Sequence, residues 1–225
     1  MNETQRTVKE LPIKLLLTAL LFLFALFFFA FLAKVVVIGN NNLFDSLVFS
    51  FLNKHTTPFL VQLMKIITFF GSANFLFPAY VGLVILLFVK PEKRLALDIA
   101  IIGISSDLLK LILKNSFRRQ RPDLPLLETL KSYSFPSGHA YSSFIFFSIL
   151  VYILWKAKMK AIWKWTLAVF LILFSLAVGV SRVVLRYHYA SDVIAGFCIG
   201  FSWVIFSLWS LNKIHFYIKK KKLLQ

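Results

Sequence analysis

An uninterrupted apolar run near the N-terminus constrains this chain more than any other feature of its sequence. Residues 15–33 contain 19 side chains without a single charge. As an α-helix this run would be about 28 Å long, at about 1.5 Å per residue, which matches the hydrocarbon core of a bilayer. Across the chain 59% of residues are hydrophobic and only 16% are charged. A water-soluble domain cannot bury that much apolar side chain, and disordered chains have the opposite composition, so both classes are excluded.

Five further apolar stretches follow the first. We therefore predict an all-α, polytopic membrane protein with six transmembrane helices in a single domain, residues 1–225. Nothing after the first run resembles a signal-peptidase site, so we interpret that run as a retained helix. The expected spans are residues 15–38, 69–90, 95–114, 139–156, 162–181 and 190–212.

The segment between the first two spans has a different pattern. In residues 43–68, apolar side chains such as Phe44, Leu47 and Phe51 recur at helical spacing, and a second apolar stripe follows Pro58. This pattern predicts two short amphipathic helices that lie in the outer membrane interface. Their role is open at this point, because a packing lid and a wall that guides a lipid chain would share the same pattern.

The formal net charge of +17 fits a nucleic-acid binder or a membrane protein with basic loops. The basic residues lie between the apolar runs, which favours the membrane protein and leaves no nucleic-acid partner. The N-terminal stretch, the connections around residues 90–94 and 156–164, and the tail hold 15 of the 26 Lys and Arg residues. By the positive-inside rule, we place these segments and both termini in the cytoplasm, as in an integral inner-membrane protein.

Three polar segments lie at the outer ends of the predicted spans, where one pocket could contain them all. Two of them bring basic residues to the outer side, against the positive-inside rule, so we infer that these charges have a local function. In one-letter code the segments are KNSFRRQRP at residues 114–122, PSGH at 136–139 and SRVVLRYHYASD at 181–192.

The third segment pairs a histidine with an acid. His188 and Asp192 are four residues apart, so on a helix their side chains share one face. A carboxylate beside an imidazole accepts the Nδ1 hydrogen and leaves the Nε2 lone pair free, which makes a neutral histidine a competent nucleophile. On its own, this spacing would more often be a helix-capping pair.

The other two segments supply groups that suit an anion. Ser137 can begin a helix and Gly138 allows close approach of a ligand, while His139 in the first turn could donate a proton to a leaving group. Lys114, Arg121 and Arg182 would add spread positive charge, as a phosphoryl group requires. Separately, these features are typical of a turn with an N-cap and of interface anchors, so the prediction depends on their combination.

Together the three segments resemble the type 2 phosphatidic acid phosphatase family of integral membrane lipid phosphatases. That family has the motifs K-x6-R-P, P-S-G-H and S-R-x5-H-x3-D, and all three match here in order and spacing. The resemblance implies that His188 attacks phosphorus, that Asp192 orients it and that His139 protonates the leaving oxygen and then helps to activate water. It also implies phosphate binding by Lys114, Arg121, Ser137, Gly138 and Arg182, with neither metal nor cofactor.

These inferences lead to one main functional hypothesis. The chain is expected to hydrolyse a phosphate mono- or diphosphate ester on a membrane lipid or polyprenyl carrier, at the periplasmic or extracellular surface. A lipid phosphotransferase that uses the same phosphohistidine remains open, and a non-catalytic lipid-binding or transport protein is less consistent with polar groups at one surface. Neither the headgroup nor the oligomeric state follows from the sequence. Five charges are left without a role: Asp107, Lys110, Arg118, Arg119 and Arg186.

Overall fold

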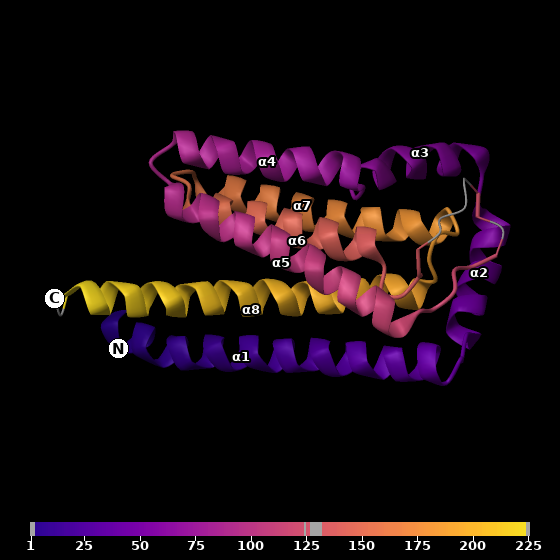
Figure 1. Ribbon diagram of the computed structural model, residues 1–225, viewed down its shortest axis with the longest axis horizontal. Coiled ribbons are helices and arrows are strands. Elements are labelled where there is room, and N and C mark those ends of the chain that lie inside the picture. The colour runs from indigo at the N-terminus through magenta and orange to yellow at the C-terminus, as the bar shows by residue number, and fades with distance from the viewer. Residues whose placement is uncertain (1–2, 124, 127–131, 224–225) are drawn as a thin grey trace.

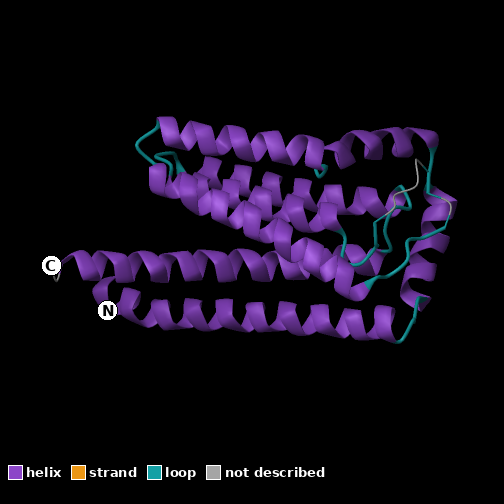
Figure 2. Cartoon of the chain, in the orientation of Figure 1, coloured by secondary structure: helices purple, strands orange, loops and turns teal. Residues whose placement is uncertain are grey.

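The computed structural model describes residues 3–123, 125–126 and 132–223, and all regular secondary structure in these residues is helical (Figure 2). The all-α prediction is therefore confirmed for the described part of the chain. The elements are α1 (Glu3–Leu32), a π-helical continuation η1 (Ala33–Ile38), α2 (Leu43–His55), α3 (Pro58–Phe69), α4 (Ala73–Val89), α5 (Lys93–Phe117), α6 (Gly138–Lys156), α7 (Ala161–Val184) and α8 (Ala190–Leu223).

The long helices form an elongated bundle whose two ends differ. Figure 1 shows the N- and C-termini at one end, where α4 also connects to α5. At the opposite end α5 finishes, α6 begins, and α7 turns into α8. The three polar segments lie at the end of α5, at the start of α6 and in the turn between α7 and α8. The fold therefore brings all of them to the end opposite the termini.

In the part of the chain that the structure describes, five segments are long and apolar enough to cross a membrane, so the expected count of six is not confirmed. Helix α5, the predicted third span, has 25 residues but is interrupted by Asp98, Asp107 and Lys110. Figure 1 nevertheless places α5 alongside the other long helices. The five segments are Leu15–Ile38, Pro58–Val89, Gly138–Lys156, Ala161–Val184 and Ala190–Lys221.

The two helices expected in the outer interface have different directions. Helix α2 crosses the end of the bundle, whereas α3 runs in line with α4 (Figure 1). Pro58 occupies the first turn of α3, and the side chain of Thr57 accepts a hydrogen bond from the amide of Leu60 at 3.2 Å. This cap and the proline explain why the chain turns sharply between α2 and α3.

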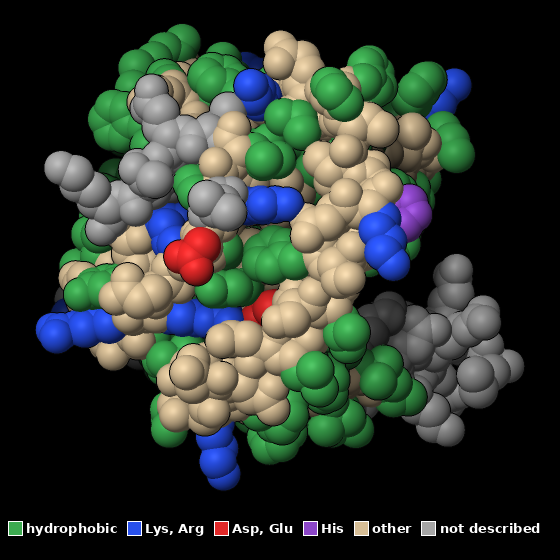
Figure 3. All heavy atoms as spheres, turned by 90° about the vertical axis from the view of Figure 1, so that its right-hand side faces the viewer, with side chains coloured by type: hydrophobic (Ala, Val, Ile, Leu, Met, Phe, Trp, Pro, Cys, Tyr) green, Lys and Arg blue, Asp and Glu red, His purple; other side chains and the backbone are tan. Residues whose placement is uncertain are grey.

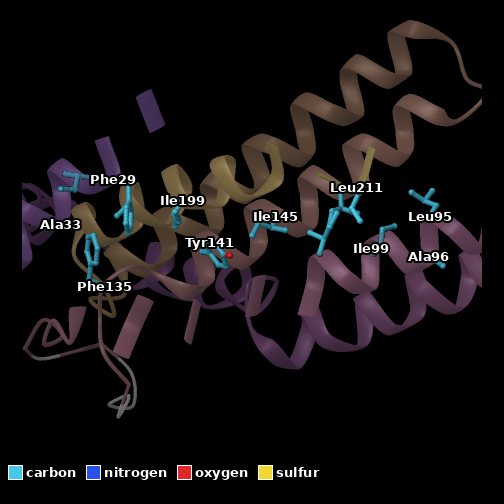
Figure 4. Packing of buried hydrophobic residues seen from close by; sticks show 14 of the residues in the cluster. Phe29, Ala33, Leu95, Ala96, Ile99, Phe135, Tyr141, Ile145, Ile199 and Leu211 are labelled. Atoms are coloured by element: carbon cyan, nitrogen blue, oxygen red, sulfur yellow. The ribbon is translucent and has the colours of Figure 1, made fainter. Parts of the chain in front are cut away.

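The buried core extends along the bundle and reaches the polar end through an aromatic cluster (Figure 4). Phe135 is fully buried there, with ring centroids 5.6 Å from Phe29 and 5.1 Å from Phe117. This packing anchors the loop that precedes α6 to α1 and α5. It fixes in place the residues on either side of Phe135, which include Ser134 and Ser137.

Candidate active site

The three polar segments meet at one cavity of about 670 Å³. Figure 3 views this end of the molecule, where Lys and Arg side chains occur at several places on the surface. The cavity continues from the polar end between α4, α5 and α6, where its walls are mostly apolar. Its polar lining includes most of the predicted site residues: Lys114, Arg121, Gly138, His139, Arg182 and His188.

His188 lies in the turn between α7 and α8 and is almost completely buried. Its Nδ1 atom is 3.2 Å from the hydroxyl oxygen of Ser134, and that hydroxyl donates to Oδ2 of Asp192. The direct distance between Nδ1 and Asp192 Oδ2 is 3.4 Å, longer than a good hydrogen bond. The predicted direct contact is therefore replaced by a serine bridge, which holds the same proton on Nδ1.

The other ring nitrogen of His188 faces the cavity. Nε2 is 3.3 Å from a guanidinium nitrogen of Arg121, and because arginine has only donors, Nε2 must present its lone pair. Burial, and after it the charges of Arg121, Lys114 and Arg182, hold the pKa of His188 well below its usual 6.5. His188 is thus neutral at pH 7, with the lone pair of Nε2 directed towards the basic residues.

Backbone carbonyls hold two of these basic residues in place. Lys114 donates to the carbonyl of Tyr133 at 2.6 Å. Arg121 donates through Nε to the carbonyl of Ser132 at 2.7 Å and through Nη1 to that of Tyr187 at 2.6 Å. Carbonyl partners orient the cations without neutralising them. In the described residues, the hydrogen bonds of Lys114 and Arg121 to these carbonyls leave both side chains beside the cavity without an acidic partner.

Arg182 completes the basic lining from the end of α7. Its Nη1 donates to the hydroxyl of Thr68 at 2.7 Å, and its guanidinium lies 4.1 Å from the ring centroid of Tyr187. The buried Nε of Arg182 has no hydrogen-bond partner among the described residues, and neither has the buried hydroxyl of Ser137. Buried polar atoms are rarely left unpaired, so these two atoms point to a polar ligand.

The start of α6 is fixed against α8. The amide of Ser137 donates to the carbonyl of Asp192 at 2.9 Å, and a methyl group on Gly196 would lie only 2.8 Å from the carbonyl oxygen of Ser137. A glycine at this position lets the two helices come together. His139 follows in the first turn of α6 and faces the same cavity as His188.

Sequence reasoning missed Ser134 and Asp45 and left Arg119 without a role. All three are buried at the polar end. Arg119 had a signal, since it lies within the first motif, and Asp45 is the only acidic residue in the amphipathic segment 43–68. Ser134 had none, because a single serine upstream of the P-S-G-H motif is not a pattern.

The other unassigned charges have local partners. Lys110 pairs with Asp107 one turn away and also lies 3.3 Å from the hydroxyl of Ser142, and all three line the cavity. Arg186 donates to the side chain of Asn53, and Arg118 donates to the carbonyl of Asn115 at 3.0 Å.

In residues 3–123, 125–126 and 132–223, no group of three or more His, Cys, Asp or Glu side chains lies close enough to hold a metal ion. The basic lining of the cavity suits an anion instead.

A helical membrane bundle with a basic, histidine-containing cavity at one end is the class of protein that the fold and the site define. A family model described as the PAP2 superfamily matches residues 95–216, which include all three motifs. The chain belongs to this superfamily, as its motifs predicted.

Known relatives agree with this assignment. Phosphatidylglycerophosphatase B of Bacillus subtilis (strain 168) is 32% identical over 145 residues, which cover 64% of this chain and 71% of the relative. The crystal structure of a transmembrane PAP2-type phosphatidylglycerolphosphate phosphatase from Bacillus subtilis is similar, with a TM-score of 0.72, 27% identity and coverage of 88% and 96% of the two chains. The crystal structure of Aquifex aeolicus LpxE is also similar, with a TM-score of 0.57 and 26% identity. The match covers 72% of this chain and 92% of LpxE. The chain is thus an enzyme, a phosphatase of this superfamily.

Proposed function

We propose that this protein hydrolyses a phosphate mono- or diphosphate ester on a membrane lipid or polyprenyl carrier, through a phosphohistidine formed on His188. The observation that carries the proposal is the position of His188. Its Nε2 lone pair faces a cavity lined by Lys114, Arg121 and Arg182, and buried atoms of Arg182 and Ser137 are unpaired. A phosphoryl group would satisfy those atoms and neutralise the cations.

The reaction then has two displacements. Nε2 of His188 bonds to phosphorus as the bond to the leaving oxygen breaks, and His139 supplies the proton that this oxygen requires. In the second step His139 accepts a proton from water as the water oxygen attacks phosphorus and the P–N bond breaks. Inorganic phosphate leaves, and His188 returns to its neutral form. Throughout, Ser134 and Asp192 hold the Nδ1 proton and stabilise the positive charge that the ring acquires.

The apolar part of the cavity supports a lipid substrate. Beyond the basic residues, its walls come from α4 and α5, with side chains such as Leu76, Val84 and Ile104. This wall suits a hydrocarbon chain, while the basic end holds the phosphate. The names of the relatives, phosphatidylglycerophosphatase B among them, favour the same substrate class.

The proposed orientation places the reaction at the outer membrane surface. The site lies at the end of the bundle opposite the termini and opposite the α4–α5 connection (Figure 1). The basic residues of that other end, including Lys90, Lys93 and Lys158, favour the cytoplasm. The substrate headgroup would accordingly be in the outer leaflet.

Replacing the nucleophile tests the proposal. Detergent-purified His188→Ala should release no phosphate from any lipid phosphate or polyprenyl diphosphate that the parent enzyme hydrolyses. Asp192→Asn should still bind substrate but turn over about 10³- to 10⁴-fold more slowly, as when a catalytic histidine loses its correct tautomer. Near-normal turnover by His188→Ala would contradict the mechanism. His55→Ala is the matched control, because His55 is exposed on α2 and should have full activity.

A further inference from the structure

A buried ionic network lies behind the His188–Asp192 pair. At its centre is Arg119, whose guanidinium donates to Oδ1 of Asp192 at 2.6 Å and to the hydroxyl of Ser191 at 2.8 Å through Nη1. Its Nη2 donates to Oδ2 of Asp45 at 2.8 Å and to the side-chain oxygen of Asn42 at 2.6 Å. One arginine therefore connects the catalytic carboxylate to the start of α2, more than 70 residues away in the sequence.

Asp45 closes the network from the α2 side. It is only 1% exposed, and its Oδ1 accepts a hydrogen bond from the amide of Ser191 at 2.9 Å. Its Oδ2 accepts the hydroxyl of Ser191 at 2.6 Å as well as Arg119. Asp45 thus contacts the residue directly before Asp192 through both backbone and side chain. The first turn of α8 is held from two directions.

These contacts leave Asp192 little freedom to rotate. Its Oδ1 is occupied by Arg119, while its Oδ2 accepts the Ser134 hydroxyl and the amide of Tyr189, the latter at 3.0 Å. The Tyr189 ring also covers the guanidinium, with 4.1 Å from the Arg119 carbon to the ring centroid. Buried ion pairs are costly to form, so their value here is fixed geometry more than stability.

We propose that Arg119 and Asp45 are positioning residues for the reaction at His188: together they hold the Asp192 carboxylate, and through Ser134 the imidazole, in the orientation for attack. The inference rests on the proposed function, since it assigns a role to residues behind the same histidine. It makes α2 part of the catalytic unit, although no residue of α2 lines the cavity. A purely structural network would stabilise the fold but would leave turnover unchanged in any variant that folds.

Three variants distinguish the two roles. Arg119→Gln removes the charge and the forked contact, and we expect kcat to fall about 10²-fold, the cost of a small misplacement of a catalytic group, with KM changed by less than about threefold. Asp45→Asn keeps size and shape but replaces one acceptor by a donor, and we expect a smaller fall in kcat, about tenfold, with KM again unchanged. The double variant removes the unpaired Asp45 charge that Arg119→Gln leaves behind, so it should recover thermal stability while kcat stays low.

Arg118→Gln is the matched control, because Arg118 is the exposed neighbour of Arg119 and its side chain donates to the carbonyl of Asn115 at the end of α5, away from the network. It should have parental kcat, KM and thermal stability. If Arg119→Gln does not fold, the kcat and KM of Asp45→Asn test the proposal. Parental kcat in a folded Arg119→Gln or Asp45→Asn, a rise in KM alone, or recovery of kcat in the double variant would each overturn the proposal. Failure of the proposed function itself is separate, since it would appear as activity in His188→Ala.

Discussion

At the scale of single residues, the reactivity of His188 is set by its surroundings on both sides of the ring. Ser134 holds the proton on Nδ1, and Arg121 faces the lone pair on Nε2. Burial disfavours the imidazolium, and the neighbouring cations disfavour it further. The site therefore keeps His188 neutral, so its Nε2 lone pair is available beside the cations that would bind a phosphate.

The lowered pKa of His188 has a consequence for pH dependence. Because the folded-state pKa lies well below 6.5, His188 stays neutral at pH values where a solvated histidine is already protonated. The acid limb of kcat/KM that belongs to the enzyme should consequently lie below pH 6.5. Between the folded-state pKa and pH 6.5, His188 is protonated in the unfolded chain but neutral in the folded one. The contribution of His188 to the free energy of unfolding is therefore fully present above pH 6.5 and is lost as the pH falls through the folded-state pKa.

The measurement is a pH profile of kcat/KM for the purified enzyme. A phosphate monoester ionises at about pH 6 and produces a limb of its own. Two substrates whose phosphate pKa values differ separate the cases, because the limb common to both belongs to the enzyme. A common limb at or above pH 6.5 would show that His188 is not shielded in this way.

Motif spacing identified several of the residues that line the cavity, but not the buried residues that hold them in place. Lys114, Arg121, His139 and His188 were predicted from spacing and do line one cavity. Asp45 and Arg119 are 74 residues apart in the sequence, and the spacing of apolar and polar residues does not predict a contact between them. A buried acid in an otherwise apolar segment acquires its meaning only from the tertiary partners that the fold provides.

At the scale of elements, the site depends on how closely α6 and α8 approach each other. Gly196 lies under the first turn of α6, and the contact there is with the backbone of Ser137, not with a flexible side chain. The amide of Ser137 is also bonded to the carbonyl of Asp192. Any widening of this contact would move the P-S-G-H segment away from His188.

Gly196→Ala should therefore impair both stability and catalysis. The added methyl group would lie 2.8 Å from the Ser137 carbonyl oxygen, so the helices must separate. Overpacking of this kind typically costs about 1–3 kcal/mol, and we expect a lower thermal transition together with reduced kcat. Thermal unfolding and phosphate release measure the two effects. Gly82→Ala is the control, since a methyl group there meets nothing within 4 Å, and parental behaviour of both variants would refute the argument.

The helices themselves were largely predictable, whereas their directions and ends were not. Apolar runs and their charged flanks gave the approximate positions of the long helices. The same rules could not show that α3 continues in line with α4 while α2 crosses the end, because amphipathic spacing gives a face but no direction (Figure 1). Nor could they show that α8 extends to Leu223, well beyond the expected end of the apolar span at residue 212.

At the scale of the whole molecule, the two ends of the bundle carry different parts of the chain. The termini and the α4–α5 connection lie at one end, and the three polar segments lie at the other (Figure 1). A chain of this kind can act on only one leaflet. Its orientation in the membrane therefore determines which pool of lipid it can reach.

Cysteine labelling tests that orientation. Asp123, in the loop that follows α5, and Met159, between α6 and α7, are both exposed, and each is replaced by cysteine in a Cys198→Ser background. In intact cells an impermeant maleimide should label the Asp123→Cys protein but not the Met159→Cys protein. Permeabilised cells, in which both proteins should react, provide the control. The reverse pattern would move the chemistry to the cytoplasmic leaflet.

The apolar cavity has a consequence for how the enzyme meets its substrate. Phe77 and Ile104 line the cavity and are also 73% and 74% exposed on the flank of the bundle, where lipid would surround them. A molecule that enters between such side chains arrives by diffusion within the plane of the membrane and never has to leave it. The relevant concentration is then a mole fraction in two dimensions. Diluting the substrate with inert phospholipid would slow the enzyme, whereas diluting the vesicles with buffer would not.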